Sequence, residues 1–346
     1  MTINDLQAGV PMARTQVRQQ TVGEDQAGVR LDKALSAWLP GLPRTRLFRL
    51  IRKGEVRVNG RRAQGDLRLA AGDVVRIPPV RLEAAADTAG AAGMTGGGAR
   101  VRGPSAALRA LVQGAILHED ERLLVLDKPA GVAVHGGSGR DFGIIEVLRA
   151  LRPGESLELV HRLDRDTSGC LLVARRPAAL RTLHALMRDG AVQKSYLVLV
   201  RGRWELGRKR VDAPLLTHTR VGGERTVRVG GGGKQALTEF SLVEQIAGRA
   251  SLLEAELHTG RTHQIRVHAA HCGHPVAGDE KYGDAAFNTE LRALGLRRMF
   301  LHAHRLGFAW PGGGEVSYSA PLPAELKQVL DALHAAPRPR RAQGRR

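Results

Sequence analysis

Residues 161–175 read HRLDRDTSGCLLVAR, a charged cluster of turn-forming residues that runs directly into an apolar strand. A turn of this kind places a carboxylate at the end of a strand, where a substrate can reach it. Asp164 lies between Arg162 and Arg165 in the sequence, and cationic neighbours within contact distance keep a carboxyl group ionised. An ionised Asp at a rigid strand end is a candidate nucleophile or base. The alternative is a solvated turn in which Asp164 only caps the backbone, and the rest of the chain decides between the two.

The charge of the chain points to a polyanionic partner. Its 346 residues carry a formal net charge of +19. Neutralisation of phosphates by Lys and Arg releases counterions, and this release drives binding to nucleic acid. The aromatic content of 3% argues against binding of single strands mainly by base stacking.

Cysteine usage and hydropathy indicate a reduced, soluble, cytoplasmic protein. Cys170 and Cys272 lie far apart and form no C-x-x-C pair, so no disulfide framework is expected. No stretch of about 18 apolar residues is present, and residues 1–20 lack the apolar core of a signal peptide. The length suits two domains.

The N-terminal part of the chain reads as a short irregular segment followed by a small module. Residues 1–20 carry no periodic pattern, and we expect them to be disordered. Residues 21–80 form the module, with helices predicted over 32–39 and 44–53. A strand from residue 55 leads into the hairpin turn Asn59-Gly60, and a second strand covers 74–77.

This module resembles the S4 RNA-binding domain. The resemblance rests on the helix that ends in Arg52-Lys53-Gly54, on the following V-x-V-N-G, and on the later G-D-x-V-x-I-P. We expect the cations of the second helix and of the hairpin to share one face, which favours RNA phosphate contacts over a merely solvated helix. The expected RNA contacts in this module are Arg44, Arg46, Arg49, Arg52, Lys53, Arg57, Arg61 and Arg62.

A second domain is expected over residues 113–335. Residues 81–112 are rich in Ala and Gly and read as a flexible linker, and residues 336–346 read as a basic disordered tail. Residues 222–233 are expected to form a mobile hairpin or loop. Because strands and helices do not alternate strictly, the fold class is α+β rather than doubly wound α/β. Strands are predicted over 123–126, 171–173, 193–200, 236–243, 252–258 and 300–310, and helices over 142–151, 177–188, 262–271 and 324–334.

Three segments of this domain give Asp164 a chemical context. Residues 194–198 form a strand whose Tyr196 can stack on a base or pack in the core. Residues 259–268 concentrate cations at a turn and a helix start, a favourable place for an anion, and Arg266 is the best candidate to pair with Asp164. The apolar members of residues 300–304 can wall a base pocket.

In order and spacing, these segments resemble the motifs of the RluA family of pseudouridine synthases. The motifs are HRLDxxTSG at 161–169, KxY at 194–196 and GRTHQIRVH at 260–268. The resemblance runs from about residue 115 to residue 330. It implies the pseudouridine synthase fold, a mixed, largely antiparallel sheet with flanking helices, preceded here by the S4-like domain. Residues 78–81, 134–139 and 148–153 are similar to family members that act on large-subunit (23S) ribosomal RNA.

The resemblance implies an isomerase that converts specific uridines of that RNA to pseudouridine. The base flips out, an aspartate-dependent step breaks the C1′–N1 bond, and C1′ is rejoined to C5. Asp164 would be the catalytic aspartate, as nucleophile or as base, with Arg266 as its partner. Tyr196 would stack on the target base, and Arg162 would fill the space that the nucleotide leaves. No cofactor and no metal are implied, no membrane is involved, and we expect a monomer. Further RNA contacts are expected at Arg165, Arg261 and His263.

Other interpretations remain open. Asp164 and Asp166 could be the acid and base of an RNA N-glycosylase, although side chains two positions apart in a tight turn point in different directions. A zinc site could use the histidine-rich stretch, but the spacing lacks a recognised metal motif. The chain could also be a non-catalytic RNA-binding assembly factor, or act on another structured RNA such as tRNA. Cys170 is expected to be a small buried hydrophobe. The histidine-rich stretch comprises His258, His263, His268, His271 and His274, with Cys272.

Overall fold

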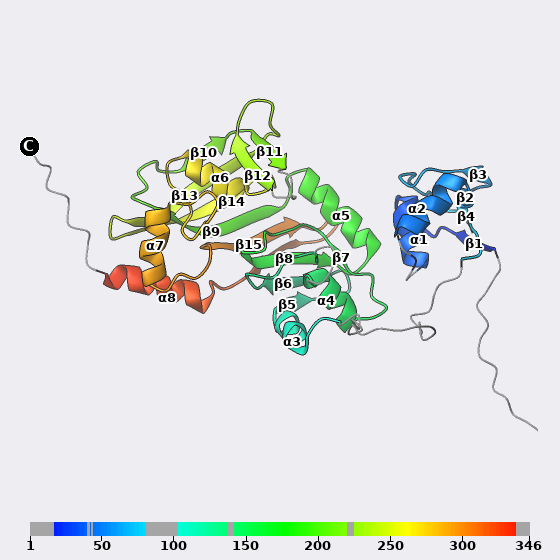
Figure 1. Cartoon of the computed structure of the whole chain (residues 1–346), viewed down its shortest axis with the longest axis horizontal. Coiled ribbons are helices and arrows are strands. Elements are labelled where there is room, and N and C mark those ends of the chain that lie inside the picture. Colours follow the sequence, from blue (N-terminus) through cyan, green and yellow to red (C-terminus); the bar gives the residue numbers. More distant parts are fainter. Residues whose placement is uncertain are drawn as a thin grey trace, which may run out of the picture. The chain divides into compact units, whose positions relative to one another are not determined.

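The chain divides into two compact units, Met1–Gly98 and Ala99–Arg346, whose elements are labelled in Figure 1. The structure is a computed structural model that describes residues 17–39, 42, 44–80, 103–136, 142–219 and 225–336. Most of the expected disordered N-terminus, linker and basic tail falls on residues 1–16, 81–102 and 337–346, which lie outside the described residues.

The first unit packs two helices against a four-stranded sheet of order β1-β4-β2-β3. Its core includes Leu31 and Leu35 from one helix, Leu47 and Ile51 from the other, and Val75 from the sheet. Both predicted helices and the predicted strand over 74–77 are confirmed. The elements are β1 (Arg18–Thr21), the 3-10 turn η1 (Glu24–Gln26), α1 (Leu31–Trp38), α2 (Arg44–Lys53), β2 (Arg57–Val58), β3 (Arg61–Arg62) and β4 (Val74–Ile77).

Residues 18–20 differ from their sequence expectation. They were expected to be disordered, but they begin β1, which pairs antiparallel with β4 from Arg18↔Ile77 to Thr21↔Val74. The residues of this short polar strand are mostly exposed, so the sequence shows no alternating hydrophobic pattern there. Its backbone hydrogen bonds to β4 hold the strand in place.

The hairpin of the first unit lies at the C-terminal end of α2. Asn59 (φ 50°) and Gly60 (φ 76°) both have the left-handed conformation that a two-residue hairpin turn requires. Arg62 donates from Nη2 to the carbonyl of Lys53 at 3.1 Å, and Arg57 donates to the carbonyl of Gly54 at 3.4 Å. These contacts bring the cations of the hairpin beside those at the end of α2.

The second unit is built on a ten-stranded mixed sheet. Its main path runs β10-β13-β14-β9-β15-β8-β6-β5, with β16 paired to β15 and β7 paired to β8. Only β15 and β8 pair in parallel among its described strands, so the mixed, largely antiparallel sheet is confirmed. The strands are β5 (Ile116–Glu119), β6 (Leu123–Lys128), β7 (Glu158–Leu159), β8 (Ser168–Ala174), β9 (Gln193–Arg201), β10 (Lys209–Asp212), β13 (Leu237–Ile246), β14 (Ala250–Leu257), β15 (Leu301–Ala309) and β16 (Glu315–Ser319).

Helices cover both faces of this sheet (Figure 1). Leu124 and Leu126 of β6 pack in the cluster that contains residues of α4 and α6, whereas Leu123 and Val125 pack with α5. This alternation is what a strand buried on both faces requires. A further cluster joins the sheet to α7 and α8. The helices are α3 (Ala106–Gly114), α4 (Ile144–Leu151), α5 (Pro177–Arg188), α6 (Gln264–His271), α7 (Ala285–Ala293) and α8 (Ala324–Ala335).

Two segments of the second unit differ from their sequence expectation. Residues 106–112 were assigned to the flexible linker but lie in α3, where Ser105 caps the helix by accepting from the backbone N–H of Leu108 at 3.2 Å. In the expected hairpin or loop over 222–233, residues 225–229 form strand β12 (Arg225–Val229). β12 pairs with β11 (Leu215–Thr219), so the hairpin interpretation is the correct one for these residues.

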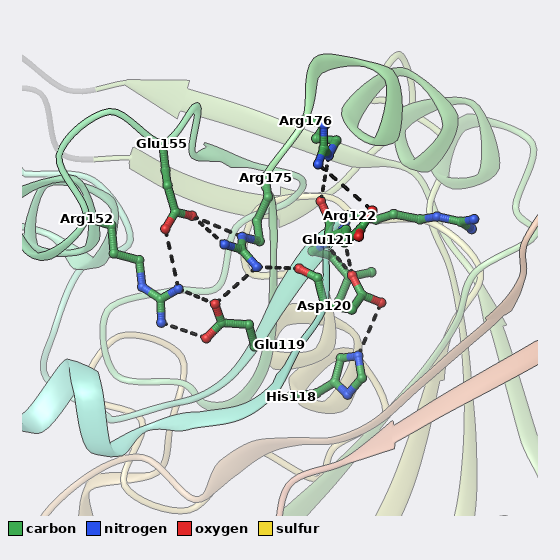
Figure 2. A network of polar contacts seen from close by, with 10 residues as sticks. His118, Glu119, Asp120, Glu121, Arg122, Arg152, Glu155, Arg175 and Arg176 are labelled. Atoms are coloured by element: carbon green, nitrogen blue, oxygen red, sulfur yellow. Dashed lines mark hydrogen bonds and ion pairs between the residues drawn. The ribbon is translucent and has the colours of Figure 1, made fainter.

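A network of ion pairs fastens the β5–β6 edge to neighbouring segments (Figure 2). Arg152, at the end of α4, binds both carboxylate oxygens of Glu119. Arg175, which follows β8, contacts Glu119 at 3.1 Å and Glu155 at 3.0 Å and donates to the backbone carbonyl of Asp120. Fork-shaped Arg–carboxylate contacts of this kind define geometry well, so they fix how β5, α4 and β8 meet.

Candidate active site

The loop at 161–167 joins β7 to β8, and a buried lysine holds it. Lys128, at the end of β6, has no exposed surface. Its Nζ donates to the carbonyls of Pro129 and Val132 at 2.8 Å each and to that of Arg165 at 3.0 Å. Burial lowers the pKa of Lys128 to about 8. Gly131 and Arg165 complete the link, since each donates to the other's carbonyl at 2.9 Å.

Gly169 fixes the start of β8 against β15. Its φ of 108° lies in the region that favours glycine, and a Cβ there would stand 2.3 Å from the carbonyl oxygen of Ala303. The two strands pair in parallel at this point, with Ser168 opposite His302. Ser168 Oγ lies 2.9 Å from His302 Nδ1 and accepts from Arg298 at 3.0 Å. Thr167 and Ser168 of the loop motif are buried, whereas the side chain of Asp164 stays partly accessible.

Asp164 lines a cavity of about 640 Å³, which we call the Asp164 cavity. It is walled by the 160–167 loop, the end of α5, Lys194 and Tyr196 of β9, and residues 257–266. Asp164 is the one carboxylate among the described residues that line it. The basic side chains on its wall are Arg162, Arg188, Lys194, Arg261 and Arg266. The arrangement suits a polyanionic ligand that presents one uncharged group to the carboxylate.

Arg266 holds Asp164 from the first turn of α6. Its Nη1 lies 3.4 Å from Asp164 Oδ2, while its Nε and Nη2 grip the two oxygens of Asp279 at 2.7 and 2.8 Å. Burial alone would lower the pKa of Arg266, but its hydrogen bonds to Asp279 raise it. Burial likewise raises the pKa of Asp279, and the bonds to Arg266 outweigh this and lower it. Asp279, whose side chain is fully buried, therefore fixes the guanidinium that faces Asp164.

His263 is the second neighbour of Asp164. Its Nε2 lies 3.8 Å from Asp164 Oδ2, and its Nδ1 lies 2.8 Å from the hydroxyl of Tyr282. The turn that carries it is fixed by the buried Gln264, whose Oε1 accepts from Thr259 Oγ1 at 2.8 Å and from the backbone of Arg261 at 3.0 Å. Burial lowers the pKa of His263, so the ring next to the carboxylate is neutral near pH 7.

The buried Tyr196 and the half-buried His161 form part of the wall. Tyr196 is only 7% exposed, yet it lines the Asp164 cavity. The sequence left open whether Tyr196 packs in the core or faces a ligand, and in the structure it does both. Burial, and then the nearby Asp164, raise the pKa of Tyr196, so its phenol stays protonated. His161 Nε2 accepts from the backbone N–H of Leu172 at 3.1 Å, and burial lowers its pKa to about 4. The His161 imidazole is therefore neutral near pH 7, and its Nε2 is engaged by the backbone of Leu172.

The predicted site residues fall into three groups. Asp164, Arg162, Arg261, His263 and Arg266 all meet at the Asp164 cavity, together with Tyr196. Arg165, the neighbour of Asp164 in the sequence, is exposed and donates to the carbonyl of Gly131. The guanidinium that pairs with Asp164 is that of Arg266. The remaining candidates lie in the first unit. There the side chains of Arg49, Arg52, Lys53, Arg57, Arg61 and Arg62 are exposed, Arg46 is half-buried, and the side chain of Arg44 lies outside the described parts.

The structure does not bring together the residues of the two alternative sites, the Asp164–Asp166 pair and the histidine-rich zinc site, among the residues it describes. Asp166 lines a different cavity, of about 390 Å³, and is not among the residues that line the Asp164 cavity. His268 contacts Thr238 and the carbonyl of Ala213, and His274 contacts the carbonyl of Arg201. In the described portion of the chain, no three His, Cys, Asp or Glu side chains are grouped as metal ligands. Cys170 is buried, and burial raises the pKa of its thiol to about 11.

Three residues of the site were missed in the sequence. The sequence interpretation places Lys128 only in the stretch that stops the strand over 123–126. Its position two residues after Leu126 puts it on the same face of an extended strand as Leu124 and Leu126, which was a signal that its side chain is buried. Asp279 and Tyr282 lie in the turn between α6 and α7, outside every motif considered. Gly278-Asp279 marks a turn, but nothing local indicates that its carboxylate holds Arg266.

Two family models match parts of the sequence. A family model described as RNA pseudouridylate synthase matches residues 122–271, and an S4 domain model matches residues 29–75. Ribosomal large subunit pseudouridine synthase C of Pasteurella multocida is 49% identical over 322 residues, which cover 92% of this chain and 94% of that protein. The protein of the same name from Escherichia coli K12 is 48% identical, with 92% of this chain and 98% of that protein covered.

Solved structures with the same fold cover about two thirds of the chain. Human RNA Pseudouridylate Synthase Domain Containing 4 aligns with a TM-score of 0.55 at 27% identity, over 66% of this chain and 95% of that chain. Human RNA Pseudouridylate Synthase Domain Containing 1 aligns with a TM-score of 0.51 at 29% identity, over 65% and 96%. Separately, none of the helices in the described ranges has the length and apolar character needed to cross a bilayer.

Proposed function

Because the chain belongs to the RNA pseudouridylate synthase family, we propose that it converts specific uridines of large-subunit ribosomal RNA to pseudouridine, with Asp164 as the catalytic carboxylate. The chain is an RNA pseudouridine synthase, an isomerase. The choice of RNA is supported by the names of relatives that match over more than nine-tenths of the chain, and by the net charge of +19.

The reaction requires that the target nucleotide leave its helix. A uridine inside a stacked duplex presents neither C1′ nor N1 to a protein side chain, so the nucleotide must flip out at a cost of a few kcal/mol. The cavity of about 640 Å³ has room for a nucleoside, and its five basic side chains can hold the flanking phosphates. In this proposal Arg162, exposed on the loop beside Asp164, occupies the position that the nucleotide vacates.

Inside the cavity, each side chain has a part in the isomerisation. The C1′–N1 bond breaks, the uracil leaves as a delocalised anion and turns, and C1′ joins C5 while a proton leaves C5 for N1. Asp164 either attacks the sugar or removes a sugar proton, and Arg266 holds its carboxylate in place. Tyr196, with a protonated phenol and a ring on the cavity wall, stacks on the base. Atoms and electrons balance within the nucleotide, so the reaction consumes neither water nor an oxidant.

The observation that carries the proposal is that Asp164 alone, of the carboxylates in the described ranges, lines the Asp164 cavity. A glycoside hydrolase uses a second carboxyl group as acid or base, placed about 5–10 Å from the first across the reacting bond. Asp166 belongs to a different cavity, and His161 and Tyr196 are held in their neutral forms. A single carboxylate surrounded by cations suits a leaving group that is itself a stable anion and stays bound for rejoining.

Asp164→Asn tests the proposal, with Asp166→Asn as the matched control. We expect D164N to lose at least about 10³-fold in kcat and to bind ribosomal RNA as the wild type does, because Arg266 keeps its two bonds to Asp279. D166N should retain activity. The measurement is pseudouridine mapping of ribosomal RNA from a deletion strain that carries each variant.

Other outcomes would lead to other assignments. Release of free uracil would identify an N-glycosylase, and pseudouridine lost only from tRNA would move the substrate to that RNA. Full complementation by D164N would leave only an RNA-binding assembly role. The proposed function also includes phosphate contacts from the S4 unit, action as a monomer and a cytoplasmic location.

A further inference from the structure

Tyr282 lies in the turn between α6 and α7 and contacts two residues of the site, His263 and Arg266, as well as Val227 of β12. Its hydroxyl accepts a hydrogen bond from the backbone N–H of Val227 in β12 at 2.9 Å. The same hydroxyl lies 2.8 Å from Nδ1 of His263. Its ring lies 4.9 Å from the guanidinium carbon of Arg266. A tyrosine that only filled the core would not need polar contacts to two different elements.

The hydroxyl contacts favour one of the two neutral tautomers of His263. The Tyr282 oxygen already accepts from Val227, so its own hydrogen is available for the lone pair of Nδ1. A neutral imidazole that accepts at Nδ1 carries its proton on Nε2. Nε2 is the atom that lies 3.8 Å from Asp164 Oδ2, so the tautomer that Tyr282 selects points an N–H at the carboxylate.

The ring and the backbone of the same residue limit the movement of Arg266. Asp279 Oδ1 accepts from the backbone N–H groups of Lys281 and Tyr282, at 2.9 and 3.0 Å, while it also binds Arg266. The guanidinium therefore contacts both the Asp279 carboxylate and the Tyr282 ring. A cation placed over an aromatic ring is attracted to the face of the ring.

Through Val227 the contacts continue into the β11–β12 hairpin. Val227 and Leu215 pack with Val267 of α6 and with Tyr282 in one small cluster. Figure 1 shows this hairpin beside α6, the helix that carries Arg266. A shift of β12 relative to α6 would therefore break the bond to Tyr282 and change the surroundings of His263.

We propose that Tyr282 is a positioning residue: it directs the Nε2–H of His263 toward Asp164, steadies Arg266 with its ring, and links both to the β11–β12 hairpin. The proposal rests on the proposed function in that it takes Asp164 as the catalytic carboxylate. Tyr282 itself lies outside the residues that line the Asp164 cavity and acts through His263 and Arg266.

The hydroxyl should also affect the titration of His263. The charged groups that face this ring are Asp164 from the loop before β8, Arg266 from α6, and Asp279 and Lys281 from the turn after it. Burial lowers the pKa of His263, Arg266 and Lys281 lower it further, and the two carboxylates raise it. A bond in which Nδ1 accepts exists only in the neutral ring, so its removal raises the pKa.

Tyr282→Phe removes the hydroxyl and keeps the ring over Arg266. We expect kcat to fall about 10-fold with KM for RNA within about twofold, because substrate contacts are unchanged. As the pH falls, an imidazolium forms earlier in the variant and pairs with Asp164. The acid limb of the kcat profile should therefore move to higher pH by about half a unit or more. Tyr318→Phe, a tyrosine in another cluster, is the matched control and should change none of these quantities.

Two further measurements decide whether Tyr282 positions His263 and Arg266 or only stabilises the fold. Nitrogen-15 NMR of the histidine rings should find His263 protonated at Nε2 in the wild type and titrating at higher pH in Y282F. In a His263→Gln background, Y282F should no longer shift the pH profile. A uniform loss of activity with a lower melting temperature and no shift would assign Tyr282 a structural role only, and a wild-type profile would also overturn the proposal. The NMR result does not depend on activity, so it separates this proposal from a failure of Asp164 as the catalytic group.

Discussion

At the scale of single residues, Lys128 shows how a buried cation can organise a loop without touching the cavity. All three of its N–H bonds go to backbone carbonyls, one of them at Arg165, next to Asp164. We predict that Lys128→Met, which keeps the volume of the aliphatic chain, destabilises the fold by about 3 kcal/mol, because the carbonyls of Pro129 and Val132 lose this donor and that of Arg165 keeps only its bond from Gly131. The kcat should also fall, as the 161–167 loop loses its attachment. Urea denaturation and single-turnover kinetics measure the two effects.

The lowered pKa of Lys128 adds a pH dependence with a definite sign. The folded value is about 8 and the ordinary value is 10.5, so between these pH values the unfolded chain binds more protons than the folded one. Stability contributed by this group therefore rises with pH across that window and is constant below it. The wild type should gain stability over K128M between pH 7.5 and pH 9.5, a range chosen around the two values. An unchanged difference would mean that the Lys128 ammonium stays charged in the folded protein.

The residue scale also shows what sequence could and could not reveal about the site. The motif around Asp164, and Arg266 with it, could be picked out because each lies in a distinctive local pattern. Asp279 and Tyr282 act through contacts that fold the chain back on itself: Arg266 meets Asp279 across 13 positions, and Tyr282 meets Val227 across 55. No local spacing encodes such a pair. Lys128 stands between the two cases, since its burial could be read from the strand but its three acceptors could not.

At the scale of elements, the packing of β8 against β15 depends on one glycine. A methyl group at Gly169 would stand 2.3 Å from the Ala303 carbonyl oxygen, on a backbone with φ of 108°. We predict that Gly169→Ala destabilises the second unit by about 3 kcal/mol or more, because both strands must shift and the conformation is strained. Gly190→Ala is the matched control. Gly190 also has a positive φ, 71°, but a Cβ there meets nothing within 4 Å, so only about 1 kcal/mol is expected.

Thermal unfolding of the two glycine variants would check this comparison. Equal losses of stability would mean that β15 can move away from β8 at little cost. In that case the parallel pairing at Ser168 and Gly169 would not be what fixes the Asp164 loop.

Elements with strong periodic patterns were predicted with nearly correct bounds, and weakly patterned ones were missed. The helices over 44–53 and 177–188 agree to the residue, because one has a clear apolar stripe and the other has Pro at its first position. α3 was missed because Ala- and Gly-rich sequence around it suggested a linker, although Ser105 offered a capping signal. β1 and β10 are short and largely exposed, and their ladders to β4 and β13 hold them. Such pairing is a tertiary effect that local sequence does not contain.

At the scale of the whole molecule, the chain joins a basic S4 unit to a catalytic unit. We expect the cations of the S4 unit to change the affinity for RNA without changing kcat. Arg52 and Lys53 are exposed at the end of α2, beside the hairpin cations. If both contact phosphates, the double variant Arg52→Ala/Lys53→Ala should bind ribosomal RNA more weakly. The slope of log affinity against log salt should also decrease by roughly 1.4–1.8, at about 0.7–0.9 per phosphate lost.

Arg203→Ala supplies the control for this measurement, since Arg203 is exposed, paired with Glu205, and outside every proposed RNA contact. It should leave both affinity and slope unchanged. Single-turnover kcat at saturating RNA should be equal in all three proteins, because phosphate contacts that do not touch the reacting nucleotide bind the ground state and the transition state alike. A double variant with the wild-type slope would show that the end of α2 does not meet the RNA backbone. A fall in kcat at saturation would show instead that the S4 unit takes part in aligning the nucleotide with Asp164.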